Sequence, residues 1–566
     1  MTDGLGLGDA YDATLGRIKG QGGEKARLGM TALMWISHSE RPLKADELCH
    51  ALGVRIGSGD LDGDNVPSIG TLLSCCQGLV ALDKGDSTVR LIHFTVQEYL
   101  RTHPELFDSA HSTIAETCLS YLNSRQTKAL SPFAFYDVRS IPFLEYSSLY
   151  WGVHAKRELS DYAKLLALKL FDDYDYHIST EILLKSEELR FCYYEYDKPY
   201  RFSGLHFASF FGIVEIVADL VGVEGCDINQ GDCAGNTPLL LAAQYGQKEV
   251  VEILLGRDGI EPDKSGIFSR TPLFIAAKNG NEEVVKMLLE RGDVNPDKPA
   301  SYGSTPLSSA AWDGHEGVVK ILLGREEVNP DRPNDEGITP LWCAACDGHE
   351  GVVKMLLERE EVNPDKPDIN GQTPLWKAAG NGHKEVVNML LERGDVNPEK
   401  PDLDGRTPLW PAAENGHEGV VKILLGRDDV NPDKSDKFGQ TPLSSAAWRG
   451  REGVVKILLG RGDVDPDKSD RFGRGPLSYA AANGHEKVVK ILLRRCRISL
   501  NKPDMSGQTP LSCAYERGHT GVVALLKPLE SATLSSPPNL SPRFEAPPRG
   551  GRGLSHFPEY ACHRKS

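Results

Sequence analysis

The chain has 566 residues, a formal net charge of -16 and a pI near 5.5. A chain of this length is expected to form about three or four domains. The acidic balance does not favour nucleic acid as the main partner, because a phosphate-binding domain needs a basic surface. No run approaches the roughly 18 apolar residues that cross a bilayer, and no basic-then-apolar signal region opens the chain. The 12 scattered cysteines fit the reduced thiols of an intracellular protein, so we expect a soluble, cytoplasmic protein with no membrane partner.

The N-terminal third predicts a winged-helix-like domain over residues 28–104, preceded by a helical lead over residues 1–27. Residues 28–52 predict a helix, a break at Arg41 and Pro42, and a second helix. The stretch SIGTLLSCCQGLVAL adds a third helix, and VALDKGDSTVRLIHFTVQEYL predicts a strand, a turn, a strand and a final helix. Three helices followed by a hairpin are typical of a winged helix. DNA binding is not expected, because the third helix, TLLSCCQGL, carries no Lys or Arg.

This region also resembles a known family. YDATLGRIK, MTALMWISHSERPL, LLSCCQGLVAL and LIHFTVQEYL resemble the winged-helix segment that follows the NACHT nucleotide-binding domain in fungal NLR-like (STAND) proteins. The resemblance implies a relay between a nucleotide switch and a C-terminal repeat sensor, with His93 at the position of a histidine that senses the ADP phosphate. No Gly-x-x-x-x-Gly-Lys-Ser/Thr motif occurs, and a lone histidine cannot bind nucleotide without one. We therefore expect no cofactor, and we expect His93 to anchor the wing to the helix that follows.

Residues 105–197 predict a helical connecting region. AETCLSYL and ELSDYAKLLALKLF are amphipathic, and IPFLEYSSLYWGVHA resembles the matching segment of the same fungal family. The next stretch, SGLHFASFFG, carries Phe207, Phe210 and Phe211, which are too apolar for a free end of a repeat stack. We expect the connecting region to dock there.

Residues 198–530 contain a repeat with a period of 34 residues. A Thr-Pro-Leu triplet begins at Thr237, Thr271, Thr305, Thr339, Thr373, Thr407, Thr441 and Thr509. Gly475-Pro-Leu fills the one gap, and the degenerate copy at Ser203 brings the number of units to ten. A fixed period of this size predicts a solenoid, in which each unit buries its apolar face on its neighbours.

The unit GQTPLWKAAGNGHKEVVNMLL predicts two helices. Thr373 is placed to cap the first helix, Pro374 occupies its first position, and Gly382 ends it with a left-handed turn. HKEVVNMLL forms the second helix, and the prolines of VNPEKPD end it. The pattern G-x-TPL-x-x-AA-x-x-GH-x-x-VV-x-x-LL resembles the ankyrin repeat, whose usual period is 33. The resemblance implies stacked helix pairs with projecting β-hairpin loops, an extra residue near Val-Asn-Pro-Asp, and a concave face that binds other proteins.

Because the repeated residues are structural, we expect partner binding at positions that differ between copies. These positions follow the alanine pair or flank the hairpin glycine, and in the ankyrin fold both point to the concave side. A stripe of aromatic residues and arginine is typical of binding hot spots. The predicted protein-binding residues are Tyr245, Phe268, Arg270, Lys278, Tyr302, Trp312, Asp313, Glu336, Asp347, Asp404, Arg406, Glu414, Phe438, Trp448, Arg449, Arg471, Phe472 and Arg517. Trp342, Trp376 and Trp410 should stack into a ladder, which either packs between units or contributes to binding.

Other motifs do not predict a metal or catalytic site. Cys343 and Cys346 form a CxxC inside a first helix, with no second pair to complete a tetrahedral site. The stretch SGDLDGDN predicts a turn, because a calcium loop would need Gly where Asn65 lies and Glu where Thr71 lies. One histidine follows the turn glycine in six units and is expected to make local hydrogen bonds: His315, His349, His383, His417, His485 and His519.

At the C-terminal end, Pro528 is expected to stop the last helix, and residues 531–566 are expected to be disordered.

The sequence as a whole predicts a mainly α protein, with an ankyrin-type solenoid after a winged-helix-like and helical region. We interpret it as a non-enzymatic scaffold that binds a partner protein and no small-molecule substrate. The alternative is the sensor half of an NLR-like switch whose NTPase domain is missing or on another chain. An exposed apolar face within residues 1–100 would favour the alternative.

Overall fold

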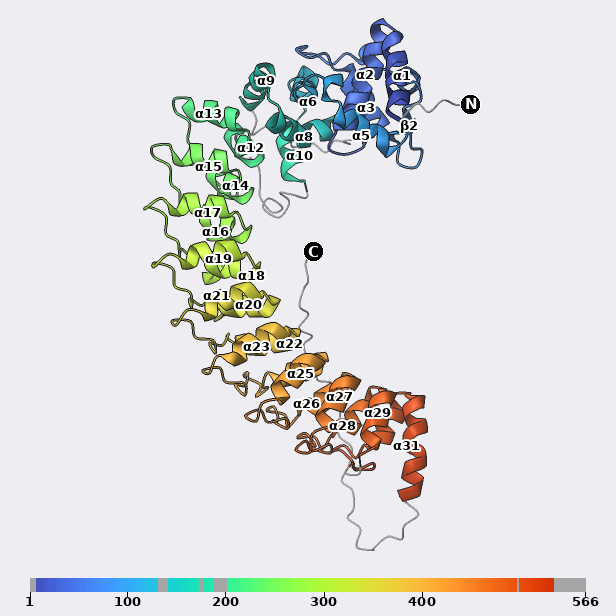
Figure 1. The fold of residues 1–566 in the computed structure, drawn as a ribbon, viewed down its shortest axis with the longest axis vertical. Coiled ribbons are helices and arrows are strands. Elements are labelled where there is room, and N and C mark those ends of the chain that lie inside the picture. The colour runs from blue at the N-terminus through green and yellow to red at the C-terminus, as the bar shows by residue number, and fades with distance from the viewer. Residues whose placement is uncertain (1–6, 131–140, 173–176, 187–200, 496–497, 534–566) are drawn as a thin grey trace. The chain divides into compact units, whose positions relative to one another are not determined.

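The protein is mainly helical, and its repeated helix pairs follow an N-terminal helical region in a computed structural model (Figure 1). The structure describes residues 7–130, 141–172, 177–186, 201–495 and 498–533. The chain divides into two compact units, Met1–Lys437 and Phe438–Ser566. The division falls inside the repeat array, so each unit is described by itself.

The N-terminal region of the first unit has the predicted winged-helix order of elements. They are α1 (Leu7–Gly20), α2 (Gly23–His38), β1 (Leu43–Lys44), α3 (Ala45–Gly53), η1 (Gly63–Asn65), α4 (Ile69–Cys75), β2 (Val80–Leu82), β3 (Thr88–Leu91), α5 (Phe94–Thr102) and η2 (Pro104–Leu106). The strand β1 was not predicted. It pairs antiparallel with β3, which also pairs with β2, so the sheet order is β1-β3-β2. Only two residues form β1, too few for an alternating pattern in the sequence.

The connecting region docks on the first repeat as expected. Its helices are α6 (Ala110–Leu122), α7 (Arg125–Lys128), α8 (Leu144–Arg157), α9 (Asp161–Phe171) and α10 (Ile178–Leu184). The ring of Trp151, from α8, stacks on that of Phe207, with 4.5 Å between centroids, and the ring of Phe171 lies 5.7 Å from Phe207. These buried aromatic contacts cover the apolar first helix of the array.

Ten helix pairs lie in the part of the array that the structure describes. The first helices are α12 (Gly204–Phe211), α14 (Pro238–Gln244), α16 (Pro272–Lys278), α18 (Pro306–Trp312), α20 (Pro340–Asp347), α22 (Pro374–Asn381), α24 (Leu409–Asn415), α26 (Pro442–Trp448), α28 (Pro476–Ala482) and α30 (Pro510–Glu516). The second helices are α13 (Val214–Gly222), α15 (Lys248–Leu255), α17 (Glu282–Leu289), α19 (Glu316–Leu323), α21 (Glu350–Leu357), α23 (Lys384–Glu392), α25 (Glu418–Leu425), α27 (Glu452–Leu459), α29 (Glu486–Leu493) and α31 (Thr520–Thr533). Within each unit, first helices pack on first helices and second helices on second helices (Figure 1).

The local physics of one repeat is as predicted. The Thr373 hydroxyl accepts a hydrogen bond from the Trp376 amide at 3.2 Å, and Gly382 ends α22 with φ of 84°. Val386 and Leu390 of the second helix are fully buried. The repeat at Thr407 differs, since α24 begins one residue later and the buried Thr407 hydroxyl has no hydrogen-bond partner.

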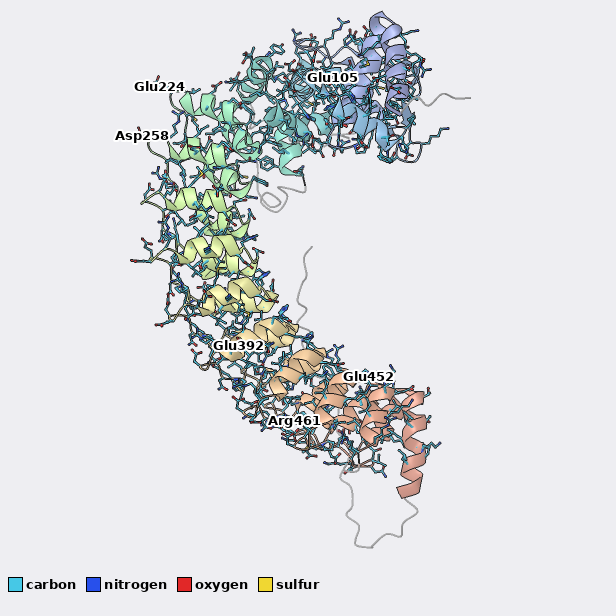
Figure 2. All side chains as sticks on the ribbon, viewed as in Figure 1. Glu105, Glu224, Asp258, Glu392, Glu452 and Arg461 are labelled. Carbon is cyan, nitrogen blue, oxygen red and sulfur yellow. The ribbon has the colours of Figure 1, made fainter. Side chains whose placement is uncertain are left out.

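The projecting loops are tight turns rather than the expected β-hairpins, and the described part of the array contains no strand. In the repeat after α21, the Asp368 amide donates to the Gln372 carbonyl at 3.1 Å, and the Asp368 carboxylate accepts from the Asn370 and Gln372 amides. One backbone bond, from Ile369 to the Glu336 carbonyl at 2.9 Å, joins this turn to the preceding one. A single bond between successive loops is too little for a strand ladder. Figure 2 shows Glu224 and Asp258 in the loops after α13 and α15, pointing away from the stacked helices.

The prediction that Pro528 stops the last helix is wrong, because α31 continues through it to Thr533. Proline removes one amide donor and crowds the carbonyl four residues earlier. Here Pro528 and Ala524 are both exposed, so water can satisfy the carbonyl that proline leaves free. Of the tail predicted as disordered, residues 534–566 lie outside the described residues.

Candidate protein-interaction surface

The predicted binding positions lie where the first helix ends and where the loops turn. The turn glycine adopts a left-handed conformation and ends the first helix. The two residues before it therefore lie at the end of the helix, after the buried alanine pair. None of the predicted binding residues is buried. The exposed ones are Phe268, Tyr302, Trp312, Asp313, Glu336, Asp347, Trp448, Arg449, Arg471, Phe472 and Arg517. The half-buried ones are Tyr245, Arg270, Lys278, Asp404, Arg406, Glu414 and Phe438.

Two loop tips hold large aromatic residues in an unfavourable backbone conformation. Phe268 has φ of 56° and Tyr302 has φ of 63°, in the left-handed region that a bulky side chain rarely adopts. Both rings are exposed, and Tyr302 is 72% exposed. Such strain costs about 1–3 kcal/mol and is concentrated at binding and catalytic sites. The two tips are therefore candidates for contact with a partner.

Most exposed aromatic rings of this surface carry a cation from the same chain. Arg270 lies over Phe268 at 5.1 Å, Arg474 over Phe472 at 4.7 Å, and Arg449 over Trp448 at 4.1 Å, measured to the ring centroids. Arg474 was not among the binding residues predicted from the sequence. Its signal is a cation two residues after the aromatic residue, the spacing that Phe268 and Arg270 also show.

The three successive tryptophans do not form the expected ladder of stacked rings. Trp342 stacks instead with Trp312, with 6.1 Å between centroids. The Lys377 ammonium lies near two of the three rings, 4.9 Å from the Trp342 centroid and 5.3 Å from that of Trp376. The Trp342 indole donates to the Gln372 carbonyl of the next repeat at 3.1 Å. These contacts support the packing role for Trp342 and Trp376.

The recurring histidines make the local hydrogen bonds that the sequence predicts. Each Nε2 bonds to a backbone carbonyl of the preceding repeat, for example His349 to Trp312 at 2.8 Å and His485 to Trp448 at 2.9 Å. The other four bonds join His315 to Lys278, His383 to Cys346, His417 to Gly380 and His519 to Ala482. Among the described residues, no group of His, Cys, Asp or Glu is arranged to hold a metal ion. Cys343 is buried and Cys346 half-buried, and both are free thiols.

The wing contains a second exposed surface. His93 caps α5, because its Nδ1 accepts from the Thr95 amide at 3.3 Å and bonds to the Thr95 hydroxyl at 2.8 Å. The expected anchoring role of His93 is therefore confirmed. On either side of it, Ile92 is 54% exposed and Phe94 is 71% exposed. None of the described helices is long and apolar enough to cross a membrane.

The comparison with protein families decides the class of the array. The family described as ankyrin repeats matches overlapping segments from residue 181 to residue 534, which is more than half of the chain. The chain belongs to the ankyrin-repeat family. Ankyrin arrays are generally protein-interaction modules, so the surface described above is the one to consider for a protein partner.

Residues 18–115 are similar to a second family, described as the GPI inositol-deacylase winged helix domain. This match covers the predicted winged helix, residues 28–104, and extends beyond it to residue 18 on one side and residue 115 on the other. No curated protein matches the chain.

Proposed function

We propose that the protein is a non-enzymatic scaffold that binds a partner protein through the concave face of its ankyrin repeats. The contact residues would be the first-helix ends and loop tips predicted from the sequence. The function needs no cofactor, nucleic acid, membrane or small-molecule substrate, and a cytoplasmic location fits the composition.

One observation carries this proposal. Trp312 and Trp448, at equivalent positions of two repeats, are 40% and 38% exposed although tryptophan is a favourable residue to bury. Exposed Phe268, Tyr302 and Phe472 extend this set along the loops. Aromatic residues interleaved with arginine are enriched at protein interfaces, where they bury much area at little entropic cost.

Affinity capture from native lysate tests the proposal. The bait is the full chain as wild type, as the double variant Trp312→Ala, Trp448→Ala, or as the control Lys320→Ala, Lys456→Ala. The control changes exposed residues on the second helices of the same two repeats. We expect partners captured by the wild type and the control to be lost from the tryptophan variant. Equal capture by all three baits would contradict the proposed surface.

We also propose the domain limits 1–27, 28–104, 105–197, 198–530 and 531–566 for the lead, winged helix, connecting region, array and tail. The packing of Trp151 on Phe207 supports a connecting region that works as the cap of the array.

The second candidate function is the sensor half of a fungal NLR-like NACHT switch. It is favoured by the exposed Ile92 and Phe94, which flank His93 and provide an uncovered apolar surface for a nucleotide-binding domain. An Ile92→Ser, Phe94→Ser variant should then lose a P-loop NTPase that the wild type captures, while the tryptophan variant retains it. If no captured protein has a P-loop, this candidate fails.

A further inference from the structure

Two repeats of the array contain the same first helix but differ in the residue that follows. Helices α18 and α26 both read Pro-Leu-Ser-Ser-Ala-Ala-Trp and end at Trp312 and Trp448. The tryptophans have nearly equal exposure, and a histidine from the next repeat bonds to the carbonyl of each. The residue after Trp312 is Asp313, whereas Arg449 follows Trp448. The same tryptophan position is thus followed by an acidic residue in one repeat and by a basic residue in the other.

At Trp448 the ring has a cation from the chain itself. The Arg449 guanidinium carbon lies 4.1 Å from the centroid of the indole. A guanidinium stacks favourably on an aromatic face, because it is planar and weakly hydrated. The end of this helix therefore accommodates a guanidinium group over the tryptophan ring.

At Trp312 no cation of the described residues lies over the ring, and the ends of α18 and α20 each carry a carboxylate. Asp313 is exposed, and Asp347 is exposed at the corresponding position of the next repeat. Within the described part of the chain, neither carboxylate has an ion-pair partner.

Helix α20, which ends at Asp347, and the turn after it both contact Trp312. His349, two residues after Asp347, bonds through Nε2 to the Trp312 carbonyl. Trp342, from the same helix as Asp347, stacks on the Trp312 ring. The packed ring and the fixed backbone hold Trp312 in place, so a ligand would not need to order it.

We propose that Trp312, Asp313 and Asp347 form a subsite for an arginine side chain of the partner protein. The guanidinium would stack on Trp312 as Arg449 stacks on Trp448, and its N–H groups would donate to the two carboxylates. This inference rests on the proposed scaffold function and assigns the chemistry of one contact. In the second unit, Arg449 occupies the equivalent position in cis, so Trp448 takes no such ligand.

Fluorine NMR of the full chain, labelled with 5-fluorotryptophan, tests the subsite. The resonances of Trp312 and Trp448 are assigned from Trp312→Phe and Trp448→Phe variants. The probe is N-acetylarginine amide, and the matched neutral control is N-acetylcitrulline amide. We expect the Trp312 resonance to shift saturably with the arginine probe in the millimolar range, and at least about fivefold more weakly with citrulline, since the charged hydrogen bonds are lost. The Trp448 resonance should not respond to either.

Two further variants exchange the residue after the tryptophan between the two repeats. Asp313→Arg gives α18 the same ending as α26 and should abolish the Trp312 response, whereas Arg449→Asp should make the Trp448 resonance respond. A Trp312 shift that is equal for both probes, or that survives Asp313→Arg, would overturn the subsite. In affinity capture, loss of partners from the tryptophan variant with full retention by Asp313→Arg would overturn the subsite and leave the scaffold function standing.

Discussion

The glycine that ends each first helix meets two requirements at once. Gly382 has φ of 84°, which L side chains rarely adopt, and a Cβ there would lie 2.5 Å from Nδ1 of His417 in the next repeat. The glycine thus allows both the left-handed turn and the approach of the histidine that bonds to the Gly380 carbonyl at 3.0 Å. The sequence pattern predicts the turn, but only the structure shows that the histidine lies against it.

Gly382→Ala should therefore destabilise the array by about 1–3 kcal/mol, through backbone strain and displacement of His417. Gly394→Ala is the matched control, because a Cβ at Gly394 meets no atom within 4 Å and no left-handed φ is required. Urea unfolding followed by circular dichroism measures both variants. Equal midpoints for the two variants would contradict this explanation of the Gly-His pair.

The binding positions could be predicted from the sequence, but the contacts of their side chains could not. Exposure after the alanine pair follows from the repeat period, which explains why Trp312 and Trp448 were identified. That the Lys377 ammonium contacts the rings of both Trp342 and Trp376 depends on side-chain directions set by packing between repeats. A single-sequence pattern contains no information on those directions.

At the scale of elements, Phe171 at the end of α9 packs closely on Gly204 at the start of α12. A Cβ at Gly204 would lie 2.3 Å from Cγ of Phe171, so these two helices approach as closely as glycine permits. The apolar first repeat predicted this docking, but nothing in the sequence pattern indicated the close approach at Gly204.

Gly204→Ala should push α9 away from α12 and destabilise the docked region by about 1–3 kcal/mol, as overpacking typically does. Gly222→Ala, at the end of the second helix of the same repeat, is the control, since a Cβ there contacts nothing within 4 Å. Hydrogen exchange of α9 measures the effect. Unchanged exchange rates in Gly204→Ala would show that the junction is less rigid than we describe.

A chain of hydrogen bonds joins the end of α2 to α6 and α8. The Tyr146 hydroxyl accepts from the Glu40 amide at 3.1 Å and is hydrogen-bonded to Nε2 of His154 at 2.9 Å. Nδ1 of His154 is in turn hydrogen-bonded to Nδ1 of His111 at 2.8 Å, so one of these two nitrogens carries the shared proton. Burial, followed by the charges of His111 and Arg157, lowers the pKa of His154 from its ordinary 6.5 to about 3. The charged groups that also face this cluster are Arg101, Glu40 and Glu158.

This cluster should make the N-terminal region sensitive to acid. The unfolded chain protonates His154 near pH 6.5, whereas the folded chain does so only near pH 3, so stability falls as pH drops through this window. The slope from the fully buried His154 is about 1.4 kcal/mol per pH unit. Urea unfolding at pH 7 and pH 5 should show a smaller difference for His154→Phe than for the wild type. The same pH dependence in both would mean that His154 does not titrate this way.

At the scale of the whole molecule, self-similarity made most of the fold predictable. Each unit repeats the same cap, turn and apolar spacing. A copy that departs from this pattern, such as the degenerate unit at Ser203, is therefore still recognised from its spacing to the other copies. The features that were missed occur once, such as β1, or lie in the last repeat that the structure describes, such as the continuation of α31 past Pro528. Neither a two-residue strand nor a terminal helix has a repeated pattern to reveal it.

The central claim is that the first-helix ends and loop tips of the array contact a partner protein. Site-specific photocrosslinking in native lysate tests it most directly, with a photoreactive amino acid at Glu336 or, as control, at Lys354. Both positions are exposed and belong to the same repeat, but Lys354 lies on the second helix. We predict a discrete crosslinked protein from position 336 that is absent when Trp312 is replaced by alanine, and none from position 354. Crosslinking from position 354 alone, or equally from both positions, would contradict the account.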